Sequence, residues 1–286
     1  MHHSVLVAVD CRADGLDAVA WAAAEASARQ ASLHILHVIR WDPFGISSVG
    51  PGDAGEHDAA RRFLDNAAER AGKIAPQLAI AAYLHTGDPA RVIAIEGNHA
   101  DLIVLGRDPT CRPHRLWARS VTRQVAARSQ RPVTVVGLSG APLRGPSAGR
   151  VVAAVSSDQG VAAAWAVLGA AFNAAHRRGV GVTVLADNPR DTARTETTMD
   201  DLLRQHREVF FDVDLQQQPL TGPRGSLLPR ASRSAALVVL AAPDGPLARW
   251  RSGSTIGRLL QTIPAPITFV HNRPARLLGS RAGGSR

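Results

Sequence analysis

The sequence has few cysteines and no long apolar runs, and each shortage excludes a class of protein. Its 286 residues include only two cysteines, Cys11 and Cys111. Two are too few for a disulfide framework and fit a reducing compartment. No stretch reaches the roughly 18 consecutive apolar residues that a membrane helix needs, so we expect no membrane partner. The chain passes from Met1 directly into an apolar run at Val5 without a basic leader, and we therefore expect a cytoplasmic protein.

The common catalytic templates are also missing. The chain has no His-Glu-x-x-His, Gly-x-Ser-x-Gly, Walker lysine or Cys-x-x-Cys motif. The histidines at 85, 99, 114, 176 and 206 are scattered singly. We therefore predict that the protein is not an enzyme. A weak ATPase is the enzymatic alternative, and it is disfavoured because no residue in the expected ligand loops is placed like a base for water.

Lysine is nearly absent from a chain that is strongly basic. The 33 basic residues outnumber the 24 acidic ones, for a formal net charge of +9, and Lys73 is the only lysine. Such a charge can indicate a nucleic-acid partner, but no run of five or more basic residues forms a binding arm. We attribute the arginine excess to the codon bias of a GC-rich genome and rank nucleic-acid binding last.

What the sequence does contain is a regular alternation of apolar runs and amphipathic stretches. Predicted strands cover 5–9, 33–39, 78–85, 102–105 and 133–136, and predicted helices cover 14–29, 58–74, 90–97 and 120–128. Continuous apolar runs are typical of strands that are covered on both faces. The alternation therefore predicts βαβ units and a parallel sheet.

The second half of the chain repeats this order. Predicted strands cover 151–155, 180–186, 209–215, 236–241 and 267–270, with helices over 161–176, 192–208, 227–234 and 253–261. Two copies of this length indicate a duplicated domain rather than a solenoid. We predict domain 1 over 1–138, a Gly-, Pro- and Ser-containing linker over 139–149, domain 2 over 150–274 and a disordered tail over 275–286.

Several short motifs occur in a fixed order along the chain. They are Val-Leu-Val-Ala-Val-Asp at 5–10, Leu-His-Val at 36–38, Thr-Gly-Asp-Pro at 86–89, Ala-Asp-Leu-Ile-Val-Leu-Gly at 100–106, and Ser-Val-Thr at 120–122 followed by Arg-Pro-Val-Thr-Val-Val at 131–136. Together they resemble the universal stress protein family. The resemblance covers both repeats, and the segment 101–106 is its most specific part.

The resemblance implies a fold and an assembly. Each repeat should be a Rossmann-like unit, a five-stranded parallel sheet of order 3-2-1-4-5 with helices on both faces. The two domains should pack as a pseudo-dimer, and two chains could pair further as a homodimer. The implied function is that of a non-enzymatic stress-response regulator that binds ATP, with or without Mg²⁺, or a related adenine nucleotide, and acts on an unknown protein partner.

The family's nucleotide residues map onto this sequence residue by residue. Asp10 and Val38 match the positions that meet adenine. The ribose and phosphate positions match Gly106, Arg107, Arg119, Ser120, Val121 and Thr122 in the first repeat, and Gly253 and Ser254 in the second.

The family's phosphate signature, G-x2-G-x9-G-[S/T], is eroded in both repeats. In the first, Gly106 is kept, but Pro109 and Arg119 replace the other glycines. Pro109 has no N–H to donate to a phosphate. Arginines in this loop could hold phosphate instead. In the second repeat the strand-end Asp has become Ser156. We expect any nucleotide site in the first repeat; the alternative is an interaction module that has lost ATP binding.

The two cysteines follow the first and fourth predicted strands, whose loops converge in this fold. A redox pair, or a metal site with His114, is therefore geometrically conceivable, but an inert free cysteine is the commoner case. We predict no metal site and leave the redox state of Cys11 and Cys111 open.

Overall fold

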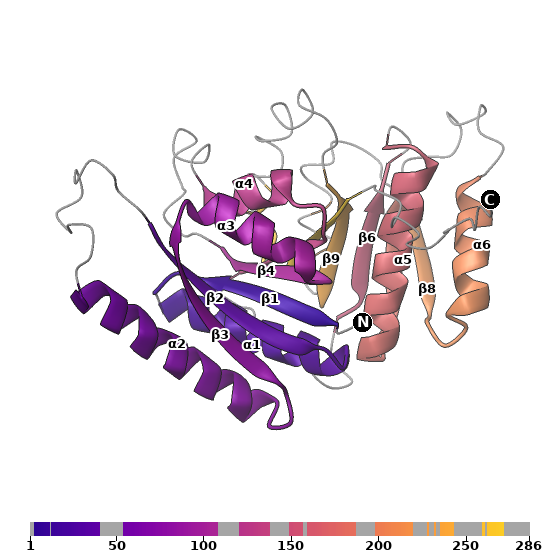
Figure 1. Ribbon diagram of the computed structural model, residues 1–286. Coiled ribbons are helices and arrows are strands. Elements are labelled where there is room, and N and C mark those ends of the chain that lie inside the picture. The colour runs from indigo at the N-terminus through magenta and orange to yellow at the C-terminus, as the bar shows by residue number, and fades with distance from the viewer. Residues whose placement is uncertain are drawn as a thin grey trace, which may run out of the picture.

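The computed structural model describes residues 3–11, 13–40, 54–107, 120–137, 149–156, 159–186, 198–219, 235–242 and 262–271, with residues 228, 232, 259 and 260. In this part of the chain ten strands form one sheet in the order β3-β2-β1-β4-β5-β10-β9-β6-β7-β8 (Figure 1). None of the described helices is long and apolar enough to cross a bilayer.

The first half of the molecule, residues 3–137, contains five parallel strands. They are β1 (Ser4–Val9), β2 (Ser32–Arg40), β3 (Ile80–Gly87), β4 (Leu102–Gly106) and β5 (Val133–Val136). Helices α1 (Ala13–Ala28) and α2 (Ala54–Ile74) cover one face, and α3 (Pro89–Glu96), the short 3-10 helix η1 (Gly97–His99) and α4 (Val121–Arg128) cover the other (Figure 1). The strand order is the predicted 3-2-1-4-5.

The second half, residues 149–271, has the same strand order, which runs along the sheet in the opposite direction from the shared edge. Its strands are β6 (Val151–Val155), β7 (Val182–Ala186), β8 (Leu215–Pro219), β9 (Leu237–Ala241) and β10 (Ile267–Val270), joined by parallel pairings. Its described helices are α5 (Val161–Arg178) and α6 (Met199–Val209). Ten strands in one sheet fit two tandem units of the predicted fold.

The two halves meet along strands β5 and β10, which pair antiparallel. Thr134 lies opposite Thr268, and their Oγ1 atoms are 2.7 Å apart in a buried hydrogen bond. The two halves were expected to pack against each other as a pseudo-dimer, and they are joined more closely than that, because their strands form one continuous sheet. Each half uses its fifth strand to cover the sheet edge of the other, and a covered edge cannot template pairing with another chain.

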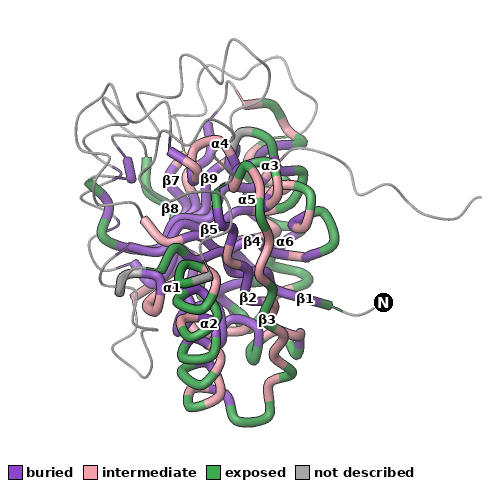
Figure 2. The backbone as a smooth tube through the Cα atoms, turned by 60° about the vertical axis from the view of Figure 1, so that its left-hand side comes forward, coloured by how far each residue is buried: buried purple, intermediate pink, exposed green. Residues whose placement is uncertain are grey.

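Two hydrophobic cores lie on opposite faces of the sheet, as strand alternation requires. Val5 and Val7 of β1 belong to the core beneath α1, α2 and α5, whereas Leu6 and Ala8 belong to the core beneath α3 and α4. Each core includes residues of both halves. Figure 2 shows the buried strands in purple between helices whose outer sides are exposed. The halves therefore share their cores as well as their sheet.

Local sequence signals explain the start of α3, the helix that approaches the site described below. The Asp88 side chain accepts a hydrogen bond from the backbone N of Arg91 at 3.0 Å, and Pro89 occupies the first turn. The helix ends at Gly97, where a Cβ atom would lie 2.2 Å from Cδ1 of Ile103. Any larger residue here would require the Ile103 side chain of β4 to shift.

One strand prediction in the second half is wrong. Residues 209–215 were expected to be a strand, but α6 extends to Val209, a turn follows, and β8 begins at Leu215. Three glutamines fill β8, and most of its residues are exposed because it is an edge strand. An exposed edge strand needs no apolar pattern. The strand was therefore predicted at the apolar residues of the preceding turn.

Candidate functional site

The candidate site lies at the carboxyl ends of β1 and β4. These strands are neighbours and parallel, with Ala8 paired to Leu105. The chain leaves β1 through α1 towards β2, and leaves β4 towards β5 on the other side of the sheet. Connections that diverge in this way leave a crevice at the switch point, which is where open α/β sheets bind ligands.

A cavity of about 310 Å³ occupies this crevice. That volume lies at the lower end of the range of about 300 to 1,000 Å³ that is usual for small-molecule pockets. The cavity is lined by residues from β1, β2, β4 and α3 and from the first turns of α1 and α4. The predicted nucleotide residues among them are Asp10, Val38, Gly106, Arg107, Val121 and Thr122.

The other predicted residues are not among the lining residues. Ser120 is 3% exposed and occupies the N-cap position of α4, where its Oγ has no hydrogen-bond partner among the described residues. Its neighbour Thr122 donates from Oγ1 to the carbonyl of Gly106 at 3.3 Å, which ties the start of α4 to the end of β4. Arg119, Gly253 and Ser254 lie outside the described residues.

Arg107 lines the cavity, but its guanidinium is directed towards the second half. Its Nη2 donates to the carbonyl of Ile263 at 2.7 Å, and its backbone N donates to the carbonyl of Val136 at 2.8 Å. Its Nε is buried without a partner among the described residues. Burial lowers the pKa of Arg107 because the charged form loses hydration. The side chain predicted to bind phosphate thus links the two halves in this structure.

His37 is a lining residue that sequence reasoning did not select. Its Nδ1 lies 2.8 Å from the carbonyl of Val9, which can only accept, so Nδ1 carries the proton. In the neutral ring Nε2 is then an acceptor, 3.5 Å from Sγ of Cys11. Val9 at the end of β1 pairs with His37 in the sheet. Aligning the two predicted strands in this register would have placed His37 at the site.

Cys11 itself is a free thiol at the edge of this site. Burial raises the pKa of Cys11, and the carboxylates of Asp10 and Glu56 raise it further. The raised pKa disfavours a reactive thiolate. Cys111 and His114, the partners considered for it above, lie outside the described residues. Within those residues, no group of three or more His, Cys, Asp or Glu side chains is arranged to hold a metal ion.

Gly15 explains how α1 comes so close to the cavity. A Cβ atom at this position would lie 2.9 Å from the backbone carbonyl of Asp10. Contacts this short between a Cβ and backbone do not occur without a shift of the chain. The glycine in the first turn of α1 thus lets the helix start pack directly on the end of β1, and the sequence alone gave no reason to choose it.

A doubly wound parallel sheet with a ligand-sized cavity at its switch point defines the molecule as a Rossmann-like α/β protein. Residues 1–137 match the universal stress protein family. The resemblance inferred from the motifs of the first half is therefore confirmed over these residues. None of the curated proteins is significantly similar to the chain in sequence.

Solved structures show the same architecture over nearly the whole chain. A universal stress protein from Archaeoglobus fulgidus DSM 4304 matches with a TM-score of 0.66 and 17% sequence identity, covering 94% of this chain and 96% of that chain. A universal stress protein from Pseudomonas aeruginosa UCBPP-PA14 matches with a TM-score of 0.57 and 16% identity, covering 94% and 93%. At these identities the similarity establishes the tandem fold and not a ligand.

Proposed function

We propose that the first half binds an adenine nucleotide, with ATP as the expected ligand, and that the protein acts as a non-enzymatic stress-response regulator. In this role the bound state would be what a protein partner recognises. The observation that supports the proposal is the cavity at the switch point, whose walls include most of the residues that the family resemblance assigned to the nucleotide.

The cavity wall offers groups suited to each part of such a ligand. Leu36, Val38 and Ile93 give an apolar surface for a purine ring, and the carboxylate of Asp10 is an acceptor for an amino group. The start of α4 supplies a positive dipole end for phosphate. Next to the lining residue Val121, the buried hydroxyl of Ser120 at the N-cap has no partner among the described residues. Asp10 is the one carboxylate among the described lining residues, so Mg²⁺ would be held chiefly by the phosphates.

A second function is an interaction module without nucleotide. It is favoured by the hydrogen bond from Arg107 to Ile263, which occupies the guanidinium that would otherwise meet phosphate. Pro109 and Arg119, in place of the signature glycines, favour it as well. In this alternative the first half keeps the family fold, and Arg107 serves only to contact the second half.

Calorimetry of the full chain with ATP and Mg²⁺ separates the two functions, supported by mass spectrometry for nucleotide carried through purification. We expect binding, and we expect Gly106→Val to weaken it at least about tenfold because the added side chain enters the cavity. Ser120→Ala should weaken it less, since one hydroxyl is lost. Gly72→Val on α2, where a Cβ meets no atom within 4 Å, is the matched control.

Absence of ATP binding by the wild-type chain would favour the interaction module. Binding with an affinity that Gly106→Val leaves unchanged would instead place the nucleotide elsewhere. Release of inorganic phosphate from ATP, measured over hours, distinguishes a weak ATPase, and we expect none.

A further inference from the structure

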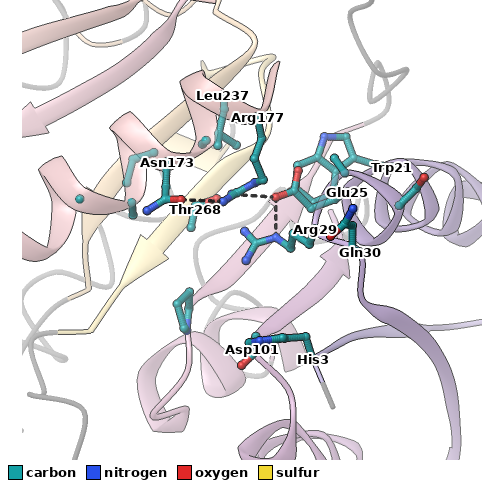
Figure 3. Close-up of a pocket in the computed structure, with 17 residues that line it drawn as sticks. His3, Trp21, Glu25, Arg29, Gln30, Asp101, Asn173, Arg177, Leu237 and Thr268 are labelled. Carbon is teal, nitrogen blue, oxygen red and sulfur yellow. Dashed lines mark hydrogen bonds and ion pairs between the residues drawn. The ribbon is translucent and has the colours of Figure 1, made fainter. Parts of the chain in front are cut away.

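A second cavity, of about 640 Å³, lies between the two halves. Helix α1 of the first half and helix α5 of the second form its walls, and strands β9 and β10 contribute Leu237, Val239 and Thr268 (Figure 3). It shares no lining residue with the cavity at the switch point. This cavity is therefore a separate site that only the tandem arrangement creates.

A buried cluster of charges forms one wall. Glu25 of α1 is 4% exposed, and three arginines surround its carboxylate. Arg29 donates from Nε to Oε1 at 2.7 Å, and Arg177 of α5 reaches the same oxygen at 3.4 Å. Arg178 donates to the other oxygen, Oε2. Three cations thus share one anion, and the cluster carries an excess of positive charge.

The cluster also lacks hydrogen-bond acceptors. Arg177 donates from Nη1 to Oδ1 of Asn173 at 3.2 Å, but its Nε is buried without an acceptor among the described residues. Arg29 uses only Nε, and its two Nη atoms make no hydrogen bond to any described residue. Cations that are largely removed from water are costly unless they are paired. An anion in the cavity would supply both the missing charge and the missing acceptors.

The opposite end of the cavity has the reverse character. His3 and Asp101 lie there, apart from the arginines (Figure 3), with Nδ1 of His3 2.8 Å from Oδ2 of Asp101. The carboxylate of Asp101 would repel an anion but would accept hydrogen bonds from a hydroxyl group. A ligand that fits both ends has an acidic group at the arginines and hydroxyl groups towards Asp101.

We propose that this cavity is a second ligand site, which binds a small hydroxylated organic anion through Arg29 and Arg177. Guanidinium groups match both carboxylate and phosphate oxygens, so the acidic group can be of either kind. The site goes beyond the proposed nucleotide function and depends on neither the first cavity nor the residues assigned to it.

Calorimetry of the full chain in a buffer without phosphate or carboxylate tests the proposal, with citrate and glycerol 3-phosphate, which are hydroxylated anions of the two acidic kinds, as separate probes. We expect at least one probe to bind, and the preferred probe identifies the acidic group. Arg177→Gln should weaken binding at least about tenfold because a charge-assisted contact is lost. Arg61→Gln, on the exposed side of α2, is the matched control and should bind as the wild type does.

Gly106→Val distinguishes this site from the nucleotide site, because it should leave the affinity for the probe unchanged. Ala170→Leu keeps every charge but narrows the cavity from α5, and it should also weaken binding. It remains informative if Arg177→Gln fails to fold, as judged by circular dichroism. The proposal is overturned if neither probe binds the wild-type chain, or if Ala170→Leu or folded Arg177→Gln binds as tightly as the wild type.

Discussion

The two halves of the molecule have the same strand order but differ at the end of their first strand. In the first half Asp10 is exposed at the cavity, whereas Ser156 at the matching place in the second half is buried. The sheet depends on buried apolar residues such as Val5 and Val151, which both halves possess. The comparison teaches that packing specifies the fold, while the polar side chains at the strand ends can differ between two halves of the same fold.

The halves also differ where they meet. The pairing of Thr134 with Thr268 is symmetric, but the charges above it are not: α1 contributes the acid Glu25, and α5 contributes the arginines 177 and 178. The sequence differences between the halves therefore make them complementary, which favours pairing within one chain over exchange between chains.

The largest expected effect comes from removing the acid of this asymmetric contact. Glu25→Gln leaves three arginines without their counter-charge in a buried place, and we expect the free energy of unfolding to fall by about 3 to 5 kcal/mol. Urea denaturation at pH 7 measures the change. The control is Glu69→Gln on α2, whose exposed carboxylate pairs with Lys73, and it should leave the urea midpoint unchanged.

The same substitution should change the response to acid. Burial by itself would raise the pKa of Glu25, but the charge of Arg178, followed by Arg29 and Arg177, outweighs burial and holds it below its ordinary value. The stabilisation is therefore complete above the unfolded pKa of about 4.3 and is lost as pH falls through the lower, folded pKa. The stability difference between wild type and Glu25→Gln should shrink in that window. A constant difference would contradict this account.

A smaller effect is expected at the symmetric part of the contact. Thr134→Val removes one partner of a buried hydroxyl pair and leaves Thr268 unsatisfied, which should cost about 1 to 3 kcal/mol of unfolding free energy. The double variant Thr134→Val with Thr268→Val should recover most of this loss, because both polar groups are then gone. Urea denaturation of the wild type, Thr134→Val, Thr268→Val and the double variant tests the coupling, and strictly additive losses would show that the hydroxyls do not act as a pair.

Much of the fold was predictable because buried strands have a strong sequence signal. The runs at 133–136, 151–155 and 267–270 were assigned with their observed bounds. The exposed strand β8 was missed because Leu215–Pro219 has no apolar pattern. The single continuous sheet was not predicted either, since the antiparallel pairing of β5 with β10 depends on a tertiary contact that leaves no periodicity in the sequence.

The site was predictable to the extent that motifs follow strand ends. Asp10 and Gly106 follow this rule, and the structure places both at one cavity. His37 and Gly15 were missed because their importance comes from neighbouring backbone, namely the carbonyls of Val9 and Asp10. The direction of the Arg107 side chain was equally beyond the sequence, because its acceptor is a carbonyl in the other half of the chain.

The smallest expected effect distinguishes the two halves as ligand sites. If the first half alone binds ATP, Ser156→Ala should leave the dissociation constant for ATP unchanged, whereas Asp10→Ala should raise it through loss of an acceptor at the cavity. Isothermal calorimetry on the two variants compares the matched positions directly. Equal weakening by both substitutions would mean that the second half also binds nucleotide, and the functional difference between the halves would then be wrong. An unchanged value for Ser156→Ala beside a raised one for Asp10→Ala would support nucleotide binding by the first half alone.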